Sequence, residues 1–189
     1  MKPQLHIIVC STRPGRVGPS VARWAEQAAL ANGKFTPQLV DLAAFKLPVF
    51  DEPEHPRLQK YHHAHTKAWS ASVHAADAFV FVLPEYNFAP PASLVNAMNY
   101  LVREWQYKPA AFVSYGGVSG GLRAVQLTKQ MLTTLKVVPM LEAVAIPNVA
   151  QHLDAGQAFV PTEAHASAAG LMFDELYRWA VAIKPLRDA

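Results

Sequence analysis

Five short apolar runs divide the chain, and each has the composition of a β-strand. The central run, residues 78–83, reads Ala-Phe-Val-Phe-Val-Leu and shows no alternation of apolar with polar side chains. Uninterrupted apolar runs of this length are typical of parallel strands that are covered on both faces. The predicted strands are residues 5–9, 35–42, 78–83, 110–114 and 137–146.

Segments with helical spacing of apolar residues separate these runs. The predicted helices are residues 21–32, 59–76, 91–102, 122–135 and 162–183. Strands that alternate with helices predict an α/β fold: a doubly wound five-stranded parallel sheet with helices on both faces. The strand order 2-1-3-4-5 suits five strands, and its switch point lies between the first and third strands. We expect a single domain over residues 1–189, because no linker or internal repeat interrupts the pattern.

The loop after the first strand, residues 10–20, combines hydroxyl and guanidinium groups just before a helix. Ser11, Arg13 and Arg16 lie in it. Helix N-terminal N–H groups together with arginines favour an anion, most naturally a phosphate. The alternative is an ordinary surface turn with solvated arginines. The loop matches neither the phosphate-binding Gly-x-x-x-x-Gly-Lys-Ser/Thr motif nor the dinucleotide fingerprint Gly-x-Gly-x-x-Gly.

Two further loops follow the third and fourth strands. Residues 84–87, Pro-Glu-Tyr-Asn, carry a carboxylate, a phenol and an amide, and residues 115–121 contain four glycines. In an open α/β sheet, ligands bind at the carboxyl ends of the strands near the switch point. So many glycines indicate that a flat or bulky ligand lies close to the backbone. We therefore expect the loop after the first strand and the Pro-Glu-Tyr-Asn loop after the third strand to face each other across one crevice.

Composition and charge narrow the class of protein. The chain is 51% hydrophobic, which favours a globular fold, and its net charge of +3 is scattered, which argues against nucleic acid as a partner. The single cysteine, Cys10, fits a reducing compartment, and no signal peptide or membrane-spanning run is evident, so we expect a cytoplasmic location without membrane attachment. His62, His63 and His65 lack carboxylate or thiolate company at a matching spacing, so no metal site is predicted.

Taken together, the three loops resemble the NAD(P)H-dependent FMN reductase family. The most specific match is Pro-Glu-Tyr-Asn-x-x-x-Pro-x-x-Leu-x-Asn-Ala at residues 84–97. That family has a flavodoxin-like fold and includes quinone, azo-dye and chromate reductases. The resemblance implies FMN as cofactor, NADPH or NADH as electron donor, and a flavin, quinone or similar small molecule as acceptor. Since the flavin carries the chemistry, no catalytic side chain is implied.

The resemblance also implies a role for each loop. The FMN phosphate would be held by Ser11, Arg13, Arg16, Val17 and Gly18, the isoalloxazine would be lined by Pro84, Glu85, Tyr86 and Asn87, and the pyrimidine end would be closed by Ser114, Tyr115, Gly116 and Gly117. The backbone N–H groups of Gly116 and Gly117 would stabilise negative charge on the reduced ring. Cys10 stands where many relatives have Gly, and Arg16 stands where some have a small hydroxyl side chain, so Arg16 would add positive charge at the phosphate. Helices beside the flavin build a dimer or tetramer in this family, so a homodimer or homotetramer is implied.

Two alternatives come from other classes of protein. Residues 117–121, Gly-Val-Ser-Gly-Gly, match the Gly-x-Ser-x-Gly element of a serine hydrolase, with Ser119 as nucleophile and His152 or His165 with Asp154 downstream. That interpretation leaves the loop after the first strand and the Pro-Glu-Tyr-Asn loop unexplained. A flavodoxin-like electron carrier without NAD(P)H turnover is the other alternative, although a carrier that docks basic partners would be strongly acidic.

Overall fold

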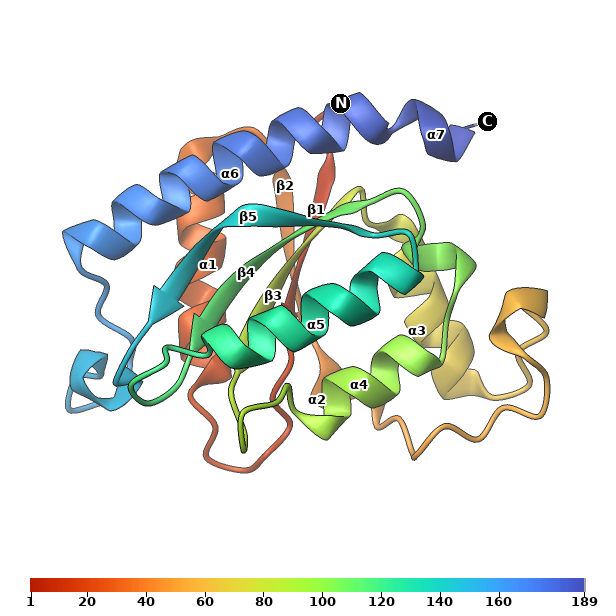
Figure 1. Cartoon of the computed structure of the whole chain (residues 1–189), viewed down its shortest axis with the longest axis horizontal. Coiled ribbons are helices and arrows are strands. Elements are labelled where there is room, and N and C mark those ends of the chain that lie inside the picture. The colour runs from red at the N-terminus through yellow and green to blue at the C-terminus, as the bar shows by residue number, and fades with distance from the viewer. Residues whose placement is uncertain (189) are drawn as a thin grey trace.

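A computed structural model describes residues 1–188 and shows one parallel sheet of five strands (Figure 1). The strand order is β2-β1-β3-β4-β5 and every neighbouring pair is parallel. The predicted flavodoxin-like fold and strand order are thereby confirmed. The strands are β1 Gln4–Val9, β2 Thr36–Asp41, β3 Ala78–Pro84, β4 Pro109–Tyr115 and β5 Val138–Ile146.

Helices cover both faces of the sheet (Figure 1). One face packs against α1 (Gly18–Asn32) and α6 (Glu163–Ile183). The other packs against α3 (Ala64–Ala75), α4 (Ala92–Asn99) and α5 (Leu122–Thr134). The remaining helical segments are short: α2 Leu42–Phe45, α7 Pro185–Asp188, and three single turns at Pro56–Leu58, Arg103–Trp105 and Val149–His152. Within residues 1–188, no helix combines the length and apolar character needed to cross a bilayer.

The central strand β3 explains why its sequence has no polar alternation. All seven of its residues are buried. Small side chains at 78, 80 and 82 face α1 and α6, while Phe79, Phe81 and Leu83 face α3, α4 and α5. Because α1 contributes mainly alanines to its core face, it packs close to the sheet. This close packing sets the position of the α1 N-terminus at the carboxyl end of β1.

Two predicted helices are shorter than expected. The helix predicted from residue 59 begins only at Ala64, because the Glu52 carboxylate accepts the backbone N–H groups of His62 (2.8 Å) and His63 (3.0 Å) and holds them in a loop. Helix α4 ends at Asn99 rather than 102, since a tight turn follows and buries Trp105. Both changes depend on contacts between distant segments.

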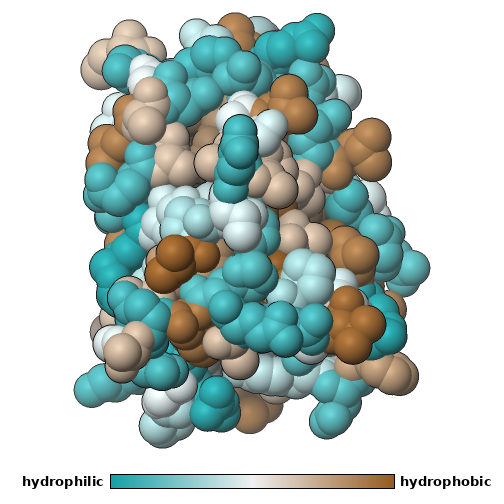
Figure 2. All heavy atoms as spheres, turned by 90° about the vertical axis from the view of Figure 1, so that its left-hand side faces the viewer, coloured by the Kyte–Doolittle hydropathy of each residue, from teal (hydrophilic) through white to brown (hydrophobic). Residues whose placement is uncertain are grey.

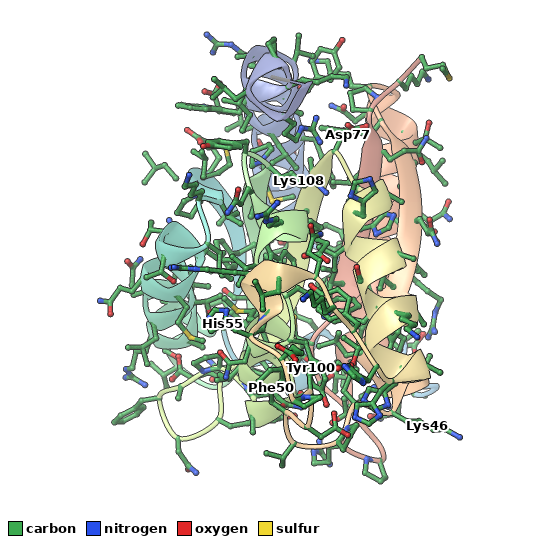
Figure 3. All side chains as sticks on the ribbon, turned by 90° about the vertical axis from the view of Figure 1, so that its right-hand side faces the viewer. Lys46, Phe50, His55, Asp77, Tyr100 and Lys108 are labelled. Carbon is green, nitrogen blue, oxygen red and sulfur yellow. The ribbon has the colours of Figure 1, made fainter. Side chains whose placement is uncertain are left out.

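Charged side chains join the segments at the amino-terminal ends of the strands. Lys108 lies beneath the C-terminal end of α3, where its Nζ donates to the carbonyl oxygens of Val73 (2.7 Å) and His74 (3.0 Å). Asp77 lies near Lys108 (Figure 3) and pairs with Arg187 at 2.9 Å. Burial lowers the pKa of Lys108 to about 7. Its hydrogen bonds to these carbonyl oxygens fix the C-terminal end of α3 at the amino-terminal ends of the strands. The three loops named above lie at the opposite, carboxyl ends.

One buried histidine makes stability depend on pH. His6 on β1 is almost completely buried, and burial together with the positive charge of Lys108 lowers its pKa to about 4. The unfolded chain, with a histidine pKa of about 6.5, therefore binds a proton between pH 6.5 and 4 that the folded chain does not. The free energy of unfolding falls as the pH is lowered through this window.

We expect His6→Gln to remove that dependence. Between pH 7 and 5, the wild-type free energy of unfolding should fall by about 2 kcal/mol more than that of His6→Gln, as measured by urea titration. The exposed His62→Gln is the matched control and should keep the wild-type slope. Equal slopes for wild type and His6→Gln would show that His6 is not the group responsible.

Candidate active site

Three loops meet where β1, β3 and β4 reach their carboxyl ends. They are residues 10–17, 85–91 and 116–121, which lie beyond neighbouring strands of the sheet. Figure 2 views the side toward which β4 and β5 run, and hydrophilic side chains dominate it with apolar ones scattered among them. The loops after β1 and β3 thus lie on either side of the switch point, as the sequence predicted.

The loop after β1 presents backbone donors without partners. Helix α1 begins at Gly18, its N-cap residue is Val17, and no side chain caps it. Among the described residues, no protein acceptor meets the backbone N–H groups of residues 11–13 or 15–17. Unpaired N–H groups at a helix N-terminus form an anion site, because they add direct hydrogen bonds to the positive end of the helix dipole.

The two arginines of this loop play different parts. Arg13 is exposed, and its guanidinium donates only to the carbonyl of its neighbour Pro14 (3.1 Å). Arg16 instead forms an ion pair with Asp41 at the end of β2. The other oxygen of Asp41 accepts the N–H of Ala43 at the start of α2 (3.0 Å). Arg16 is therefore paired with a carboxylate, whereas Arg13 has no carboxylate partner among the described residues and is free to meet an anion.

Below the same loop, Tyr115 joins β4 to β1. Its hydroxyl donates to Ser11 Oγ at 3.2 Å, and both side chains are buried. A Cβ added to Gly18 would lie 2.4 Å from Ser11 Oγ and 2.8 Å from the Tyr115 hydroxyl oxygen. Burial raises the pKa of Tyr115 well above its usual value, so it remains a neutral donor. The Tyr115 side chain therefore supports the loop after β1.

Glu85, directly after β3, reaches across to α5. Its carboxylate accepts the N–H of Arg123 (3.1 Å), the N–H of Ala124 (3.4 Å) and the Arg123 guanidinium (2.8 Å). Burial by itself raises the pKa of Glu85, but hydrogen bonds from Ser119, Arg123 and Ala124 outweigh it and leave the pKa below its usual value. Glu85 thus caps α5 as a carboxylate and locks the third-strand loop to the fourth-strand loop.

Beyond Glu85 the chain makes a tight turn. Tyr86 and Ala89 exchange both backbone hydrogen bonds at 2.9 Å, and the two residues between them, Asn87 and Phe88, have φ of 49° and 68°. All three residues 86–88 are exposed. The Arg123 guanidinium carbon lies 4.1 Å from the centre of the Phe88 ring. Neither Phe88 nor Arg123 was expected from the sequence, although an aromatic residue directly after Pro-Glu-Tyr-Asn was the available signal.

The glycine-rich loop after β4 is fixed by hydrogen bonds to the protein on one side and borders open space at Gly117. Ser114 is buried and donates to the Gly120 carbonyl (2.7 Å). The Gly116 N–H donates to the Ile146 carbonyl (3.3 Å), which contradicts the expectation that it is free for a ligand. Gly117 has no partner for its N–H in the part of the chain that the structure describes, and a Cβ added to it would meet nothing within 4 Å. Gly117 therefore borders open space.

The hydrolase alternative finds no triad here. Ser119 Oγ accepts the N–H of Gly121 (3.2 Å) and belongs to the Glu85 cluster. His165 is buried, and its Nδ1 accepts the N–H of Thr162 (3.1 Å) at the start of α6. Asp154 accepts the N–H groups of its own loop, Gly156 and Ala158, both at 2.8 Å. None of these contacts joins Ser119 to His165 or Asp154, so the hydrolase alternative is not favoured.

Fold and loops together define a flavodoxin-like α/β protein whose loop after β1 leaves backbone N–H groups unpaired at the start of α1, beside the switch point. Residues 3–151 match the NADPH-dependent FMN reductase family. The chain therefore belongs to that family, and the resemblance drawn from its three loops is confirmed. It is an oxidoreductase of the type that uses NAD(P)H and FMN, and the electron-carrier and hydrolase alternatives are not favoured.

Individual relatives agree with this assignment. The chain is 40% identical over 149 residues to an NAD(P)H-dependent FMN reductase of Schizosaccharomyces pombe, which covers 77% of this chain and 74% of the relative. It is 30% identical over 146 residues to the quinone reductase of Escherichia coli, covering 74% of each. Among solved structures, the flavoenzyme FerB of Paracoccus denitrificans superposes with a TM-score of 0.75 at 20% identity, covering 96% of this chain and 98% of that one. This last likeness shows the fold.

Gly18 provides a test of the loop's construction. Gly18→Ala forces Ser11 and Tyr115 to move, because its methyl group would overlap both, and should lower the free energy of unfolding by about 1–3 kcal/mol. Gly170→Ala, within α6, adds a methyl group that meets nothing within 4 Å and should stabilise the protein by roughly 0.5–1 kcal/mol. Chemical denaturation of both variants measures the two effects. A Gly18→Ala protein as stable as the wild type would contradict the packing described.

Proposed function

We propose that this protein transfers hydride from NADPH or NADH, through bound FMN, to a small-molecule acceptor such as a quinone. The family match supports the cofactor and the donor, and the curated relatives include both FMN reductases and quinone reductases. The observation that carries the proposal is the set of unpaired N–H groups at residues 11–13 and 15–17, on the other side of the switch point from the exposed turn at residues 86–88. When bound, FMN supplies the redox chemistry.

The residues present fit FMN at both of its ends. The unpaired backbone N–H groups around Ser11 and Val17, the start of α1 at Gly18 and the exposed Arg13 suit a terminal monophosphate. Arg16 stiffens this loop through Asp41. At the other end, Tyr86, Asn87 and Gly117 border the space that a planar ring would occupy. Pro84, Glu85, Ser114, Tyr115 and Gly116 hold these loops in place from below.

No acid–base side chain is required of this site, and the protein's own part is to bind and orient. The N–H of Gly117 has no acceptor among the described residues. It therefore suits the polar edge of the ring, where negative charge develops on reduction. The Glu85 cap holds the loop of Gly117 against the loop of Tyr86. We propose that residues 1–189 form one such binding unit.

Assembly into a homodimer or homotetramer, in the cytoplasm, forms part of the proposal. A groove of about 800 Å³ lies between the loop at residues 50–56 and helices α4 and α5, and much of its lining is apolar, including Phe50, Met98, Leu101, Met131 and Leu135. Figure 3 shows Phe50 and His55 on this loop and Tyr100 close to Phe50, with which it makes a ring contact at 5.1 Å. An apolar groove of this size suits a second subunit. Cys10 as the single cysteine supports a reducing compartment.

We expect light scattering at micromolar concentration to give at least twice the chain mass of 20.7 kDa. Met131→Glu, which places a charge in the groove, should shift the mass toward that of the monomer, because burying an unpaired charge is costly. Leu171→Glu, at an exposed position on α6, is the matched control and should leave the assembly unchanged. A monomeric wild type would contradict the proposed assembly.

The flavin site is tested by two variants that separate the phosphate from the ring. The purified wild type should bind one FMN and oxidise NADPH in the presence of a quinone. Arg13→Ala should weaken FMN binding by about 1.5–3 kcal/mol, the worth of a hydrogen bond to a charged group, and leave riboflavin binding unchanged. Gly117→Val should weaken both ligands, because its side chain fills the space beside the ring.

Calorimetric titration with FMN and with riboflavin measures these effects. Arg23→Ala, an exposed arginine on the outer side of α1, is the control for Arg13 and should bind both ligands like the wild type. Gly117→Val should retain the wild-type melting temperature, since nothing in the protein lies within 4 Å of the added Cβ. If Arg13→Ala weakens FMN and riboflavin equally, the loop after β1 does not hold the phosphate.

A further inference from the structure

The turn after β3 holds an aromatic residue in a conformation that favours glycine. Asn87 and Phe88 both lie in the left-handed region, and the two hydrogen bonds between Tyr86 and Ala89 leave them no freedom to escape it. Two-residue turns of this type favour asparagine followed by glycine. Phe88 occupies the glycine position, where a bulky side chain strains the backbone. Glycine would adopt the same turn without this strain.

Packing within the protein does not explain this choice. The Phe88 side chain is 64% exposed, so its ring gains little from burial. An apolar ring that is both strained and exposed stabilises the chain in neither respect. Strained residues persist mainly where a site needs the side chain in one position. Phe88 shares its turn with Tyr86 and Asn87, which border the proposed flavin space.

Arg123 fixes one side of the ring. Its guanidinium carbon lies 4.1 Å from the ring centre, within the range of a cation–π contact. The same guanidinium donates to Glu85 at 2.8 Å, and the Glu85 side chain is only 8% exposed. A buried carboxylate therefore holds the cation, and the cation holds the ring. The result is a fixed aromatic surface beside the half-exposed guanidinium of an ion pair whose carboxylate is buried, at the exposed turn after β3.

We propose that Phe88 and Arg123 form the recognition subsite for planar, anionic aromatic electron acceptors next to FMN. This inference rests on the proposed function. The sign of the charge distinguishes acceptor from donor. A nicotinamide ring becomes positively charged when it gives up hydride, which a neighbouring guanidinium opposes, whereas a quinone gains negative charge on reduction, which the guanidinium stabilises. Phe88 provides the stacking surface and Arg123 the attraction for the anion.

The experiment measures binding without turnover. Naphthalene-2-sulfonate, a planar anion that accepts no hydride, is titrated by calorimetry into the FMN-loaded protein, and uncharged 2-naphthol is the comparison ligand. Phe88→Leu should weaken both ligands about two- to tenfold, the range for an aromatic pair. Arg123→Met should weaken the sulfonate at least threefold more than the naphthol. The Kd for FMN should change less than twofold in Phe88→Leu.

The matched control is Tyr107→Leu. Tyr107 is also a left-handed aromatic (φ 56°) beside a cation, with Lys136 Nζ 5.1 Å from its ring centre, but it lies before β4 at the opposite edge of the sheet. This variant should bind both ligands like the wild type. Phe88→Gly adds a second readout: it should raise the melting temperature by relieving the strain while it weakens the ligands as Phe88→Leu does.

Three results would overturn the subsite. They are unchanged binding of the naphthalene ligands by Phe88→Leu and Phe88→Gly, an equal loss in Tyr107→Leu, or a parallel loss of FMN that makes Phe88 part of the flavin pocket. These outcomes leave the proposed function intact. A wild type that binds no FMN would instead overturn the proposed function, and the subsite with it.

Discussion

The arrangement of the loops at the carboxyl ends of the strands depends on the contact that Tyr115 makes with Ser11 beside the backbone of Gly18. The hydroxyl that ends β4 supports the loop that follows β1, and no side chain other than that of glycine fits between them. Because both partners are buried, neither group can turn to solvent without leaving an unpaired polar atom. The start of α1 is thereby held to the sheet, with its unpaired N–H groups facing outward.

A second contact organises the opposite wall. The Glu85 carboxylate caps α5 and pairs with Arg123, so it joins the loop after β3 to the loop after β4. Flavin chemistry asks little of protein side chains beyond such rigidity, because the cofactor carries the electrons. Most polar groups in these loops accordingly bind one another. The groups left over are backbone N–H donors, one exposed arginine and the exposed turn, and they mark where ligands are expected.

The three loops singled out from the sequence do lie together at the carboxyl ends of the strands, but several of their side chains have partners that the sequence did not reveal. The three loops were identified by their position after buried strands and by their polar or glycine-rich composition. Within them, Glu85, Ser114 and Tyr115 point into the protein, and Arg16 is neutralised by Asp41. No local pattern reveals such pairings, since the partners lie 6 to 104 residues apart. Phe88 and Arg123 were missed for the same reason.

The sequence by itself determined the sheet, its strand order and the family. Continuous apolar runs require burial on both faces, and a parallel sheet with flanking helices is the arrangement that provides it. Only the tertiary structure decided which polar groups remain free for a ligand. A hydrogen bond between distant segments satisfies two groups that look identical to free ones in the sequence. Glu52 holding His62 and His63 out of α3, and Asp41 holding Arg16, both depend on where the folded chain places their partners.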